Sequence, residues 1–128
     1  MSNRFEVGVV AVFEAFHLMP GASGPEGQLH QHRYRMEVTA DRPGLDEHGM
    51  VVDLEVFHPA VRSLVADLEG KDLSFIKPED AEAVTVEVLS KWAHGALAPM
   101  ARGQGAETLS VRVWESEDAF GGYSSTVR

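Results

Sequence analysis

The chain of 128 residues contains no cysteine, which removes several kinds of chemistry at once. Disulfide bonds, thiolate metal ligands and a cysteine nucleophile are all excluded. Basic residues are also scarce, with 11 Lys and Arg against 20 Asp and Glu, so the formal net charge is −9. Because this charge repels a phosphate backbone, we expect no nucleic-acid partner.

Long apolar segments are missing as well. The apolar run at residues 7–12 is bracketed by Glu6 and Glu14 and is far too short to cross a bilayer. No secretory signal or membrane anchor is visible, so we expect a cytoplasmic protein that binds no membrane. The remaining composition, 44% hydrophobic and 24% charged, is typical of a globular protein, and we expect one domain spanning residues 1–128.

Two stretches with the periodicity of β-strands carry three of the six histidines. In residues 4–17 alternate positions are apolar, and His17 is the last position of that parity. In residues 29–40, His30 and His32 share a parity with a tyrosine, a methionine and a valine. Since alternate side chains of a strand point to one face, all three imidazoles are expected on the apolar face.

The loop between these strands, residues 18–28, is rich in proline and glycine, which predicts no regular structure there. Antiparallel pairing across it would bring His17 close to His30 and His32. Three neutral imidazole nitrogens suit Zn²⁺ with one position open for water or substrate, as in catalytic zinc sites. The alternative is three hydrogen-bonded core histidines, but these would compete for few buried partners, at a cost of about 1–3 kcal/mol for each one left unpaired.

Two amphipathic helices are predicted after the second strand. The first has an apolar stripe at helical spacing, formed by Val61, Leu64, Val65 and Leu68. We expect Asp53 to cap its start, Pro59 to lie in its first turn and Gly70 to follow its end. The second spans roughly residues 85–97, with Thr85 as its cap. Its apolar side is expected to contain Val88, Leu89, Trp92 and Ala96.

Two further strands are predicted at residues 109–115 and 120–127. The order ββααββ indicates an α+β fold, an antiparallel four-stranded sheet with two helices on one face. Glu115 is the next residue of inward parity at the end of its strand, where a carboxylate beside a pocket is a reasonable ligand anchor. The alternative is that the strand ends there and Glu115 is solvated.

Five short segments spread along nearly the whole chain carry a resemblance to a known family. They are Phe13-x-Ala15-x-His17, Leu29-His30-Gln31-His32-Arg33-Tyr34, Gly49-Met50-Val51-Val52-Asp53, Thr85-x-Glu87 and Val111-Arg112-Val113-Trp114-Glu115. In this order and spacing they resemble the motifs of the 6-pyruvoyl-tetrahydropterin synthase / 6-carboxytetrahydropterin synthase family, which has the tunnelling fold.

The resemblance implies a pterin substrate, 7,8-dihydroneopterin triphosphate, and Zn²⁺ bound by His17, His30 and His32. It also implies that Glu115 grips the pterin, and that Thr85 and Glu87 contribute to substrate binding. A sheet with open edges, together with the resemblance, predicts a ring-like homo-oligomer, a hexamer, with the site between subunits.

Two departures from the family pattern concern catalysis. The family's catalytic cysteine is replaced by Glu26, four residues before His30, and the histidine of the Leu-Asp-His-x-x-Leu-Asn motif is replaced by Gly70. The aspartate of that motif aligns with Glu69. Relatives with glutamate for cysteine are associated with cleavage of the side chain to 6-hydroxymethyl-7,8-dihydropterin, but normally keep the Asp-His pair. Glu26 and Glu69 are therefore the predicted catalytic residues, with Glu26 as general base.

These residues leave several functions open. We expect a zinc-dependent lyase that cleaves the pterin side chain by a retro-aldol step. The alternatives are 6-pyruvoyl- or 6-carboxytetrahydropterin synthase activity proper, and a zinc- and pterin-binding protein with impaired catalysis, which Gly70 favours. A cupin-type β-barrel metalloenzyme also uses His-x-His, but the two helices argue against it. The other histidines match no motif and are expected at the surface or in the core; they are His48, His58 and His94.

Overall fold

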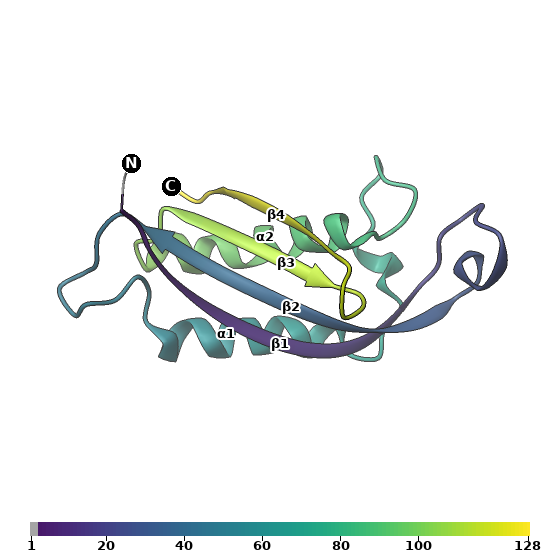
Figure 1. The fold of residues 1–128 in the computed structure, drawn as a ribbon, viewed down its shortest axis with the longest axis horizontal. Coiled ribbons are helices and arrows are strands. Elements are labelled where there is room, and N and C mark those ends of the chain that lie inside the picture. Colours follow the sequence, from purple (N-terminus) through teal and green to yellow (C-terminus); the bar gives the residue numbers. More distant parts are fainter. Residues whose placement is uncertain (1–2) are drawn as a thin grey trace.

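Alternating apolar residues form two long strands, β1 (Phe5–His17) and β2 (His30–Arg42), which pair antiparallel along their full length. The computed structural model describes residues 3–128. Strand β3 (Thr108–Trp114) pairs with β2, and β4 (Phe120–Thr126) pairs with β3, both antiparallel. The sheet order is therefore β1-β2-β3-β4, and the strands lie side by side in sequence order in Figure 1.

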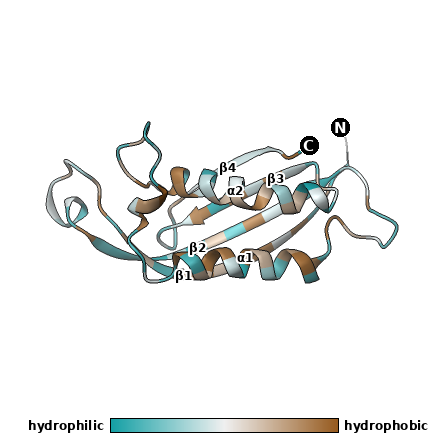
Figure 2. Ribbon diagram, turned by 180° about the vertical axis from the view of Figure 1, so that it is seen from behind, coloured by the Kyte–Doolittle hydropathy of each residue, from teal (hydrophilic) through white to brown (hydrophobic). Residues whose placement is uncertain are grey.

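Both helices cover the same face of the sheet. Helix α1 (Leu54–Leu68) packs against β1, and helix α2 (Val86–Gly103) packs against β3 and β4. Figure 2, seen from behind, shows them side by side in front of the strands. This arrangement confirms the predicted ββααββ α+β fold. Within residues 3–128, no helix has the length and apolar character needed to cross a membrane.

The starts of both helices were predicted correctly. The Asp53 carboxylate accepts a hydrogen bond from the Glu55 backbone N–H at 2.9 Å, and the Thr85 hydroxyl oxygen accepts one from the Val88 N–H at 3.1 Å. Each side chain thus satisfies a backbone donor that the helix leaves unpaired. The placement of Pro59 was wrong. Because α1 already begins at Leu54, Pro59 lies in its second turn.

The predicted end and apolar side of the second helix need correction. Helix α2 continues through Pro99 to Gly103, six residues beyond the predicted end. Its buried stripe is Leu89, Ala93, Leu97 and Ala101, whereas Val88 and Trp92 are half-buried and Ala96 is exposed. Both stripes have helical spacing, but the alanines at positions 93 and 101 let the helix lie close to β3 and β4. The larger Val88 and Trp92 stay at the rim.

The core lies between the sheet and the two helices, and its largest side chains come from every layer. Those that are almost fully buried include Phe13, Tyr34, Met36, Phe57, Leu68, Leu73, Leu89 and Leu109. Beyond this core, β1 and β2 project past the end of β3, because β3 pairs only with residues 35–41 of β2. Residues 30–34 of β2 therefore pair with β1 alone.

The connections near this projecting end differ from the sequence prediction. The loop of residues 18–28 contains a short 3₁₀ turn, η1 (Gly24–Gly27), where no regular structure was expected, and a second turn, η2 (Leu73–Ile76), follows α1. Strand β3 ends at Trp114, so Glu115 lies just beyond it, and the Glu115 N–H donates to the Ala119 carbonyl at 3.1 Å.

Candidate metal centre

The β1–β2 register brings the three predicted histidines together. His17 lies opposite His30, and His32 lies opposite Ala15 on the same face. The ring centroid of His17 is 4.5 Å from that of His30 and 4.9 Å from that of His32, and the centroids of His30 and His32 are 4.7 Å apart. His17 is buried, and the other two are half-buried. The imidazoles thus lie together on one face, as the alternation of the two strands predicted. Their binding of a metal stays a prediction.

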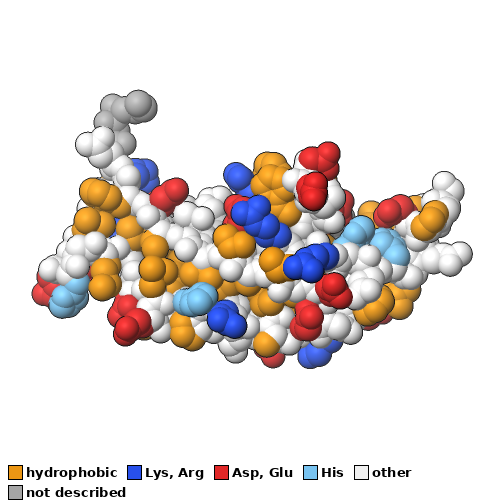
Figure 3. Space-filling view, turned by 60° about the horizontal axis from the view of Figure 1, so that its bottom comes forward, with side chains coloured by type: hydrophobic (Ala, Val, Ile, Leu, Met, Phe, Trp, Pro, Cys, Tyr) orange, Lys and Arg blue, Asp and Glu red, His pale blue; other side chains and the backbone are white. Residues whose placement is uncertain are grey.

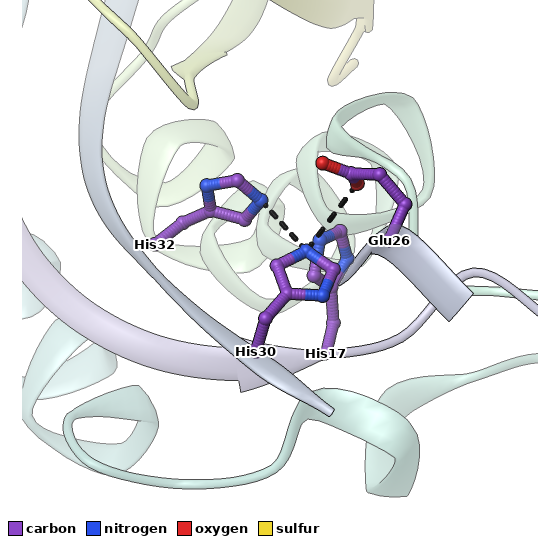
Figure 4. A group of neighbouring side chains, drawn as sticks. All are labelled: His17, Glu26, His30 and His32. Carbon is purple, nitrogen blue, oxygen red and sulfur yellow. Dashed lines mark hydrogen bonds and ion pairs between the residues drawn. The ribbon is translucent and has the colours of Figure 1, made fainter. Parts of the chain in front are cut away.

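A carboxylate from the connecting loop completes the group. One ligand atom from each of His17, Glu26, His30 and His32 lies within 4.8 Å of the others. Figure 4 shows these side chains pointing toward one another, with Glu26 Oε2 at 3.4 Å from His30 Nε2. Glu26 was predicted as a base and was not among the predicted metal ligands. Its spacing, four residues before His30, was the available signal, but the turn η1 that directs it inward was not predicted.

Backbone carbonyls fix how two of the imidazoles present their nitrogens. His17 Nδ1 donates to the Val84 carbonyl at 3.0 Å, and His30 Nδ1 donates to the Gln28 carbonyl at 2.8 Å. Because a carbonyl only accepts, each Nδ1 carries the hydrogen and each Nε2 keeps its lone pair.

One of these nitrogens has no hydrogen-bond partner. His17 Nε2 is buried without any partner in the described residues, whereas His30 Nε2 and His32 Nε2 lie 3.0 Å apart, within hydrogen-bond distance of each other. A buried acceptor without a partner costs about 1–3 kcal/mol. A metal ion among these atoms would satisfy them, so the donor set fits Zn²⁺, which takes imidazole nitrogen and carboxylate oxygen.

The surroundings of His32 favour the uncharged form that a metal needs. Burial lowers the pKa of His32, and His17 and His30 add to this effect, while Glu115 and Glu26 oppose it. Burial also raises the pKa of Tyr34, whose ring lies 5.6 Å from that of His32 and stays uncharged. An uncharged His32 leaves a ring-nitrogen lone pair available for binding a cation.

Another predicted site residue, Glu115, acts electrostatically on the centre. It is half-buried, and it contributes to the electrostatics of both His32 and Tyr34. It lines a hollow at the end of β3. The rest of this hollow is lined by Val12, Arg33, Tyr34, Arg35, Trp114, Ser116 and Glu117. The hollow therefore adjoins the part of β2 that extends beyond β3.

Thr85 and Glu87 lie at the start of α2, next to the contact that orients His17. Thr85 directly follows Val84, the acceptor of the His17 Nδ1–H. Its hydroxyl oxygen is used as the helix cap. Glu87 is exposed in the first turn of α2, close to Gly121 of β4. Their contact with a substrate stays a prediction.

Glu69 and Gly70 lie on the outer edge of β1, and the described cluster does not include them. The Glu69 carboxylate accepts a hydrogen bond from the Glu14 N–H at 2.7 Å, and the Gly70 N–H donates to the Glu14 carbonyl at 2.7 Å. The Glu69 side chain is thus engaged with the backbone of β1, and its catalytic role also stays a prediction.

Comparison with known proteins identifies the family. The family model described as 6-pyruvoyl tetrahydropterin synthase matches residues 6–125. The 6-pyruvoyl tetrahydropterin synthase of Plasmodium falciparum matches with a TM-score of 0.78 at 14% identity, over 98% of this chain and 99% of that chain. The Caenorhabditis elegans enzyme matches with a TM-score of 0.73 at 16% identity, over 98% of each chain.

Two variants of the Plasmodium vivax enzyme, in which a catalytic glutamate is replaced by cysteine or alanine, also match, with a TM-score of 0.73 at 14% identity over 98% of this chain and 99% of theirs. No curated protein sequence matches the chain significantly. The sheet and helices thus form the tunnelling fold, and the family supports pterin-related lyase chemistry in general terms. Because the family model covers nearly the whole chain, this protein belongs to the 6-pyruvoyl tetrahydropterin synthase family.

Proposed function

We propose that this protein is a Zn²⁺-dependent lyase that cleaves the side chain of 7,8-dihydroneopterin triphosphate, or a close derivative, to give a 6-substituted dihydropterin. The observation that carries the proposal is the convergence of three imidazoles and one carboxylate at the end of the β1–β2 hairpin. Family membership supports the pterin, and the composition of the cluster supports the metal.

His17, His30 and His32 would hold the Zn²⁺. When bound, it would supply Lewis-acid chemistry for the hydroxyl groups of the substrate side chain. The protein's own contribution is orientation. The carbonyls of Val84 and Gln28 hold His17 and His30 with Nε2 toward the cluster, so little rearrangement is needed when the metal enters.

Glu115 would hold the pterin ring at the other side of the site. The amino-pyrimidine edge of a pterin offers adjacent N–H donors, which match the two oxygens of a carboxylate in a bidentate, charge-assisted pair. Glu115 is half-buried and close enough to His32 to act on its pKa, so a ring held by its carboxylate would direct its side chain toward the cluster. Thr85 and Glu87 are proposed to assist from the start of α2.

Glu26 would act as general base. Its carboxylate would take the proton of the hydroxyl group on the second side-chain carbon, and the bond between this carbon and the first side-chain carbon would break. The hydroxyl carbon becomes the carbonyl of the leaving aldehyde, and the electron pair of the broken bond enters the C=N system of the dihydropterin ring. Return of the proton to the exocyclic carbon completes a retro-aldol cleavage to 6-hydroxymethyl-7,8-dihydropterin.

Cleavage is favoured over formation of the pyruvoyl product because of the number of bases required. Moving a proton between two side-chain carbons calls for bases on both sides of the substrate. Gly70 cannot supply one, and the Glu69 carboxylate accepts a hydrogen bond from the backbone of β1. The catalytic glutamate of the P. vivax relative supports a carboxylate in the catalytic role.

Product identification tests this function. The zinc-loaded protein is incubated with 7,8-dihydroneopterin triphosphate beside the Glu26→Gln variant, and the pterin products are identified. We expect 6-hydroxymethyl-7,8-dihydropterin from the wild type and much less from the variant. A pyruvoyl product from the wild type, or undiminished cleavage by the variant, would reject the assignment.

A second candidate is a zinc- and pterin-binding protein with impaired catalysis, and Gly70 is the observation that favours it. Gly70 adopts a φ of 73°, in the left-handed region that side-chain-bearing residues rarely occupy. The backbone here therefore disfavours the histidine of the family motif. Tight binding of 7,8-dihydroneopterin without any product would support this candidate over the lyase.

A further inference from the structure

The Glu26 carboxylate lies where a fourth metal ligand would lie. Its Oε2 is 3.4 Å from His30 Nε2, and all four ligand atoms lie within 4.8 Å of one another. Ligand atoms that share one Zn²⁺ are within about 4 Å of each other, because each bond is about 2.0–2.2 Å long. Side-chain movements much smaller than the length of a side chain would thus allow all four ligand atoms to bind one ion.

Glu26 differs from the three histidines in how firmly it is held. The histidines stand on paired strands, whereas the Glu26 side chain is 60% exposed and belongs to the turn η1. Its backbone is fixed, since the Glu26 carbonyl accepts a hydrogen bond from the Met19 N–H at 2.8 Å. Rotation of the side chain alone can therefore move the carboxylate into the cluster or out to solvent.

Nothing else in the described chain competes for this carboxylate. Among residues 3–128, no lysine or arginine lies within ion-pair distance of Glu26, and His30 is its one partner of that kind. Within the four-residue cluster, Glu26 is the one carboxylate, so it would bring a negative charge to a divalent cation held by the imidazoles. Both its position and its charge thus favour binding to the metal.

We infer that Glu26 is a displaceable fourth ligand, which closes the metal site in the substrate-free protein and leaves when the hydroxyl groups of a substrate bind. The inference rests on the zinc site of the proposed function and deepens it. The displaced carboxylate would stand beside the hydroxyl group that displaced it. One residue would thereby guard the metal in the resting state and then become the base, which links substrate binding to the appearance of the base.

Metal binding without substrate tests the inference. Zn²⁺ dissociation constants are measured by chelator competition for the wild type, Glu26→Ala and Glu47→Gln, with folding checked by circular dichroism. Glu47 is a control because its side chain is 85% exposed and lies in the loop at the opposite end of the molecule. We expect at least about a 10-fold loss of Zn²⁺ affinity in Glu26→Ala and no change in Glu47→Gln. A loss of about 10-fold is the lower end of what is lost when a residue that only hydrogen-bonds to a metal ligand is removed.

The visible spectrum of the Co²⁺-substituted protein provides a second readout, because it reports the ligand set. We expect Glu26→Ala to differ from the wild type, and addition of 7,8-dihydroneopterin to change the wild-type spectrum as Glu26 leaves. Equal Zn²⁺ affinity in the wild type and Glu26→Ala would overturn the inference. So would a loss of affinity with an unchanged spectrum, because the carboxylate would then act only as a nearby charge. Neither measurement needs turnover. Failure of this inference can therefore be distinguished from failure of the proposed lyase reaction.

Discussion

His17 shows how a single side chain of this site depends on residues far away in the sequence. Its Nδ1–H is held by the carbonyl of Val84, and its buried Nε2 has no partner among the described residues. The parity of β1 predicted that His17 points inward. It did not predict the carbonyl partner, because Val84 belongs to an irregular segment whose position is set by tertiary packing and not by periodicity.

The lowered pKa of His32 predicts an acid-sensitive metal-free protein. Its pKa lies below the ordinary value of about 6.5, so on acidification the unfolded chain takes up a proton that the folded protein resists. The contribution of His32 to the free energy of unfolding is therefore fully present above pH 6.5 and is lost as the pH falls below this value. Urea denaturation of the metal-free protein across this range should show a shallower decline for His32→Gln, with His48→Gln as the control. The same slope in wild type and His32→Gln would contradict the prediction.

Replacement by alanine should have opposite effects on stability at Gly70 and at Gly95. Since its φ is 73°, Gly70→Ala should lower the free energy of unfolding by about 1–2 kcal/mol, the cost of the left-handed region. Gly95 lies in the exposed part of α2 with open space around it, so Gly95→Ala should raise that free energy by about 0.5–1 kcal/mol. Denaturant unfolding measures both. A stabilising Gly70→Ala would show that the backbone is relaxed there.

At the scale of elements, strands and helix starts could be predicted from the sequence because their signals are local. Alternation predicted the β1–β2 hairpin, and Asp53 and Thr85 marked the helix starts. The buried side of α2 could not be predicted, since two stripes had helical spacing and packing on β3 and β4 selected one. The turn η1 was missed because glycine and proline mark where a loop occurs and not its conformation.

The cap of α2 should affect both stability and metal binding. Thr85→Ala removes the hydrogen bond to the Val88 N–H and should cost about 0.5–2 kcal/mol of stability. Because Val84 precedes it and orients His17, Zn²⁺ affinity should fall as well. Asp53→Ala, which removes the cap of α1, is the matched control. It should lose a similar amount of stability and keep its Zn²⁺ affinity unchanged. Equal Zn²⁺ affinities in the two variants would separate the cap from the metal site.

The molecule as a whole leaves sheet edges and apolar side chains uncovered. Residues 70–72 cover the end of β1, but along residues 5–12 its outer edge has no strand partner within the described chain, and neither has the outer edge of β4. Phe5, Val10 and Val12 are exposed on β1. In Figure 3, where β1 and α1 turn toward the reader, hydrophobic side chains lie at several places across this face. Open edges of this kind invite strand pairing between copies.

From these open edges we predict a ring-like homo-oligomer in solution, and the resemblance to the 6-pyruvoyl tetrahydropterin synthase family implies that it is a hexamer. Pairing of β1 with a partner's sheet edge would cover the exposed valines and satisfy the free backbone groups. Light scattering at working concentration measures the mass directly. A particle of 14.0 kDa, the mass of one chain, would contradict this prediction.

Metal analysis of the purified protein tests most directly whether the β1–β2 register builds a zinc site from His17, His30 and His32. We predict about one Zn²⁺ per chain in the wild type, and the same content in His48→Ala, whose side chain is 69% exposed and lies outside the cluster. His32→Ala should lose most of its zinc while keeping its fold. Wild-type zinc content in a folded His32→Ala variant would show that these histidines do not hold the zinc.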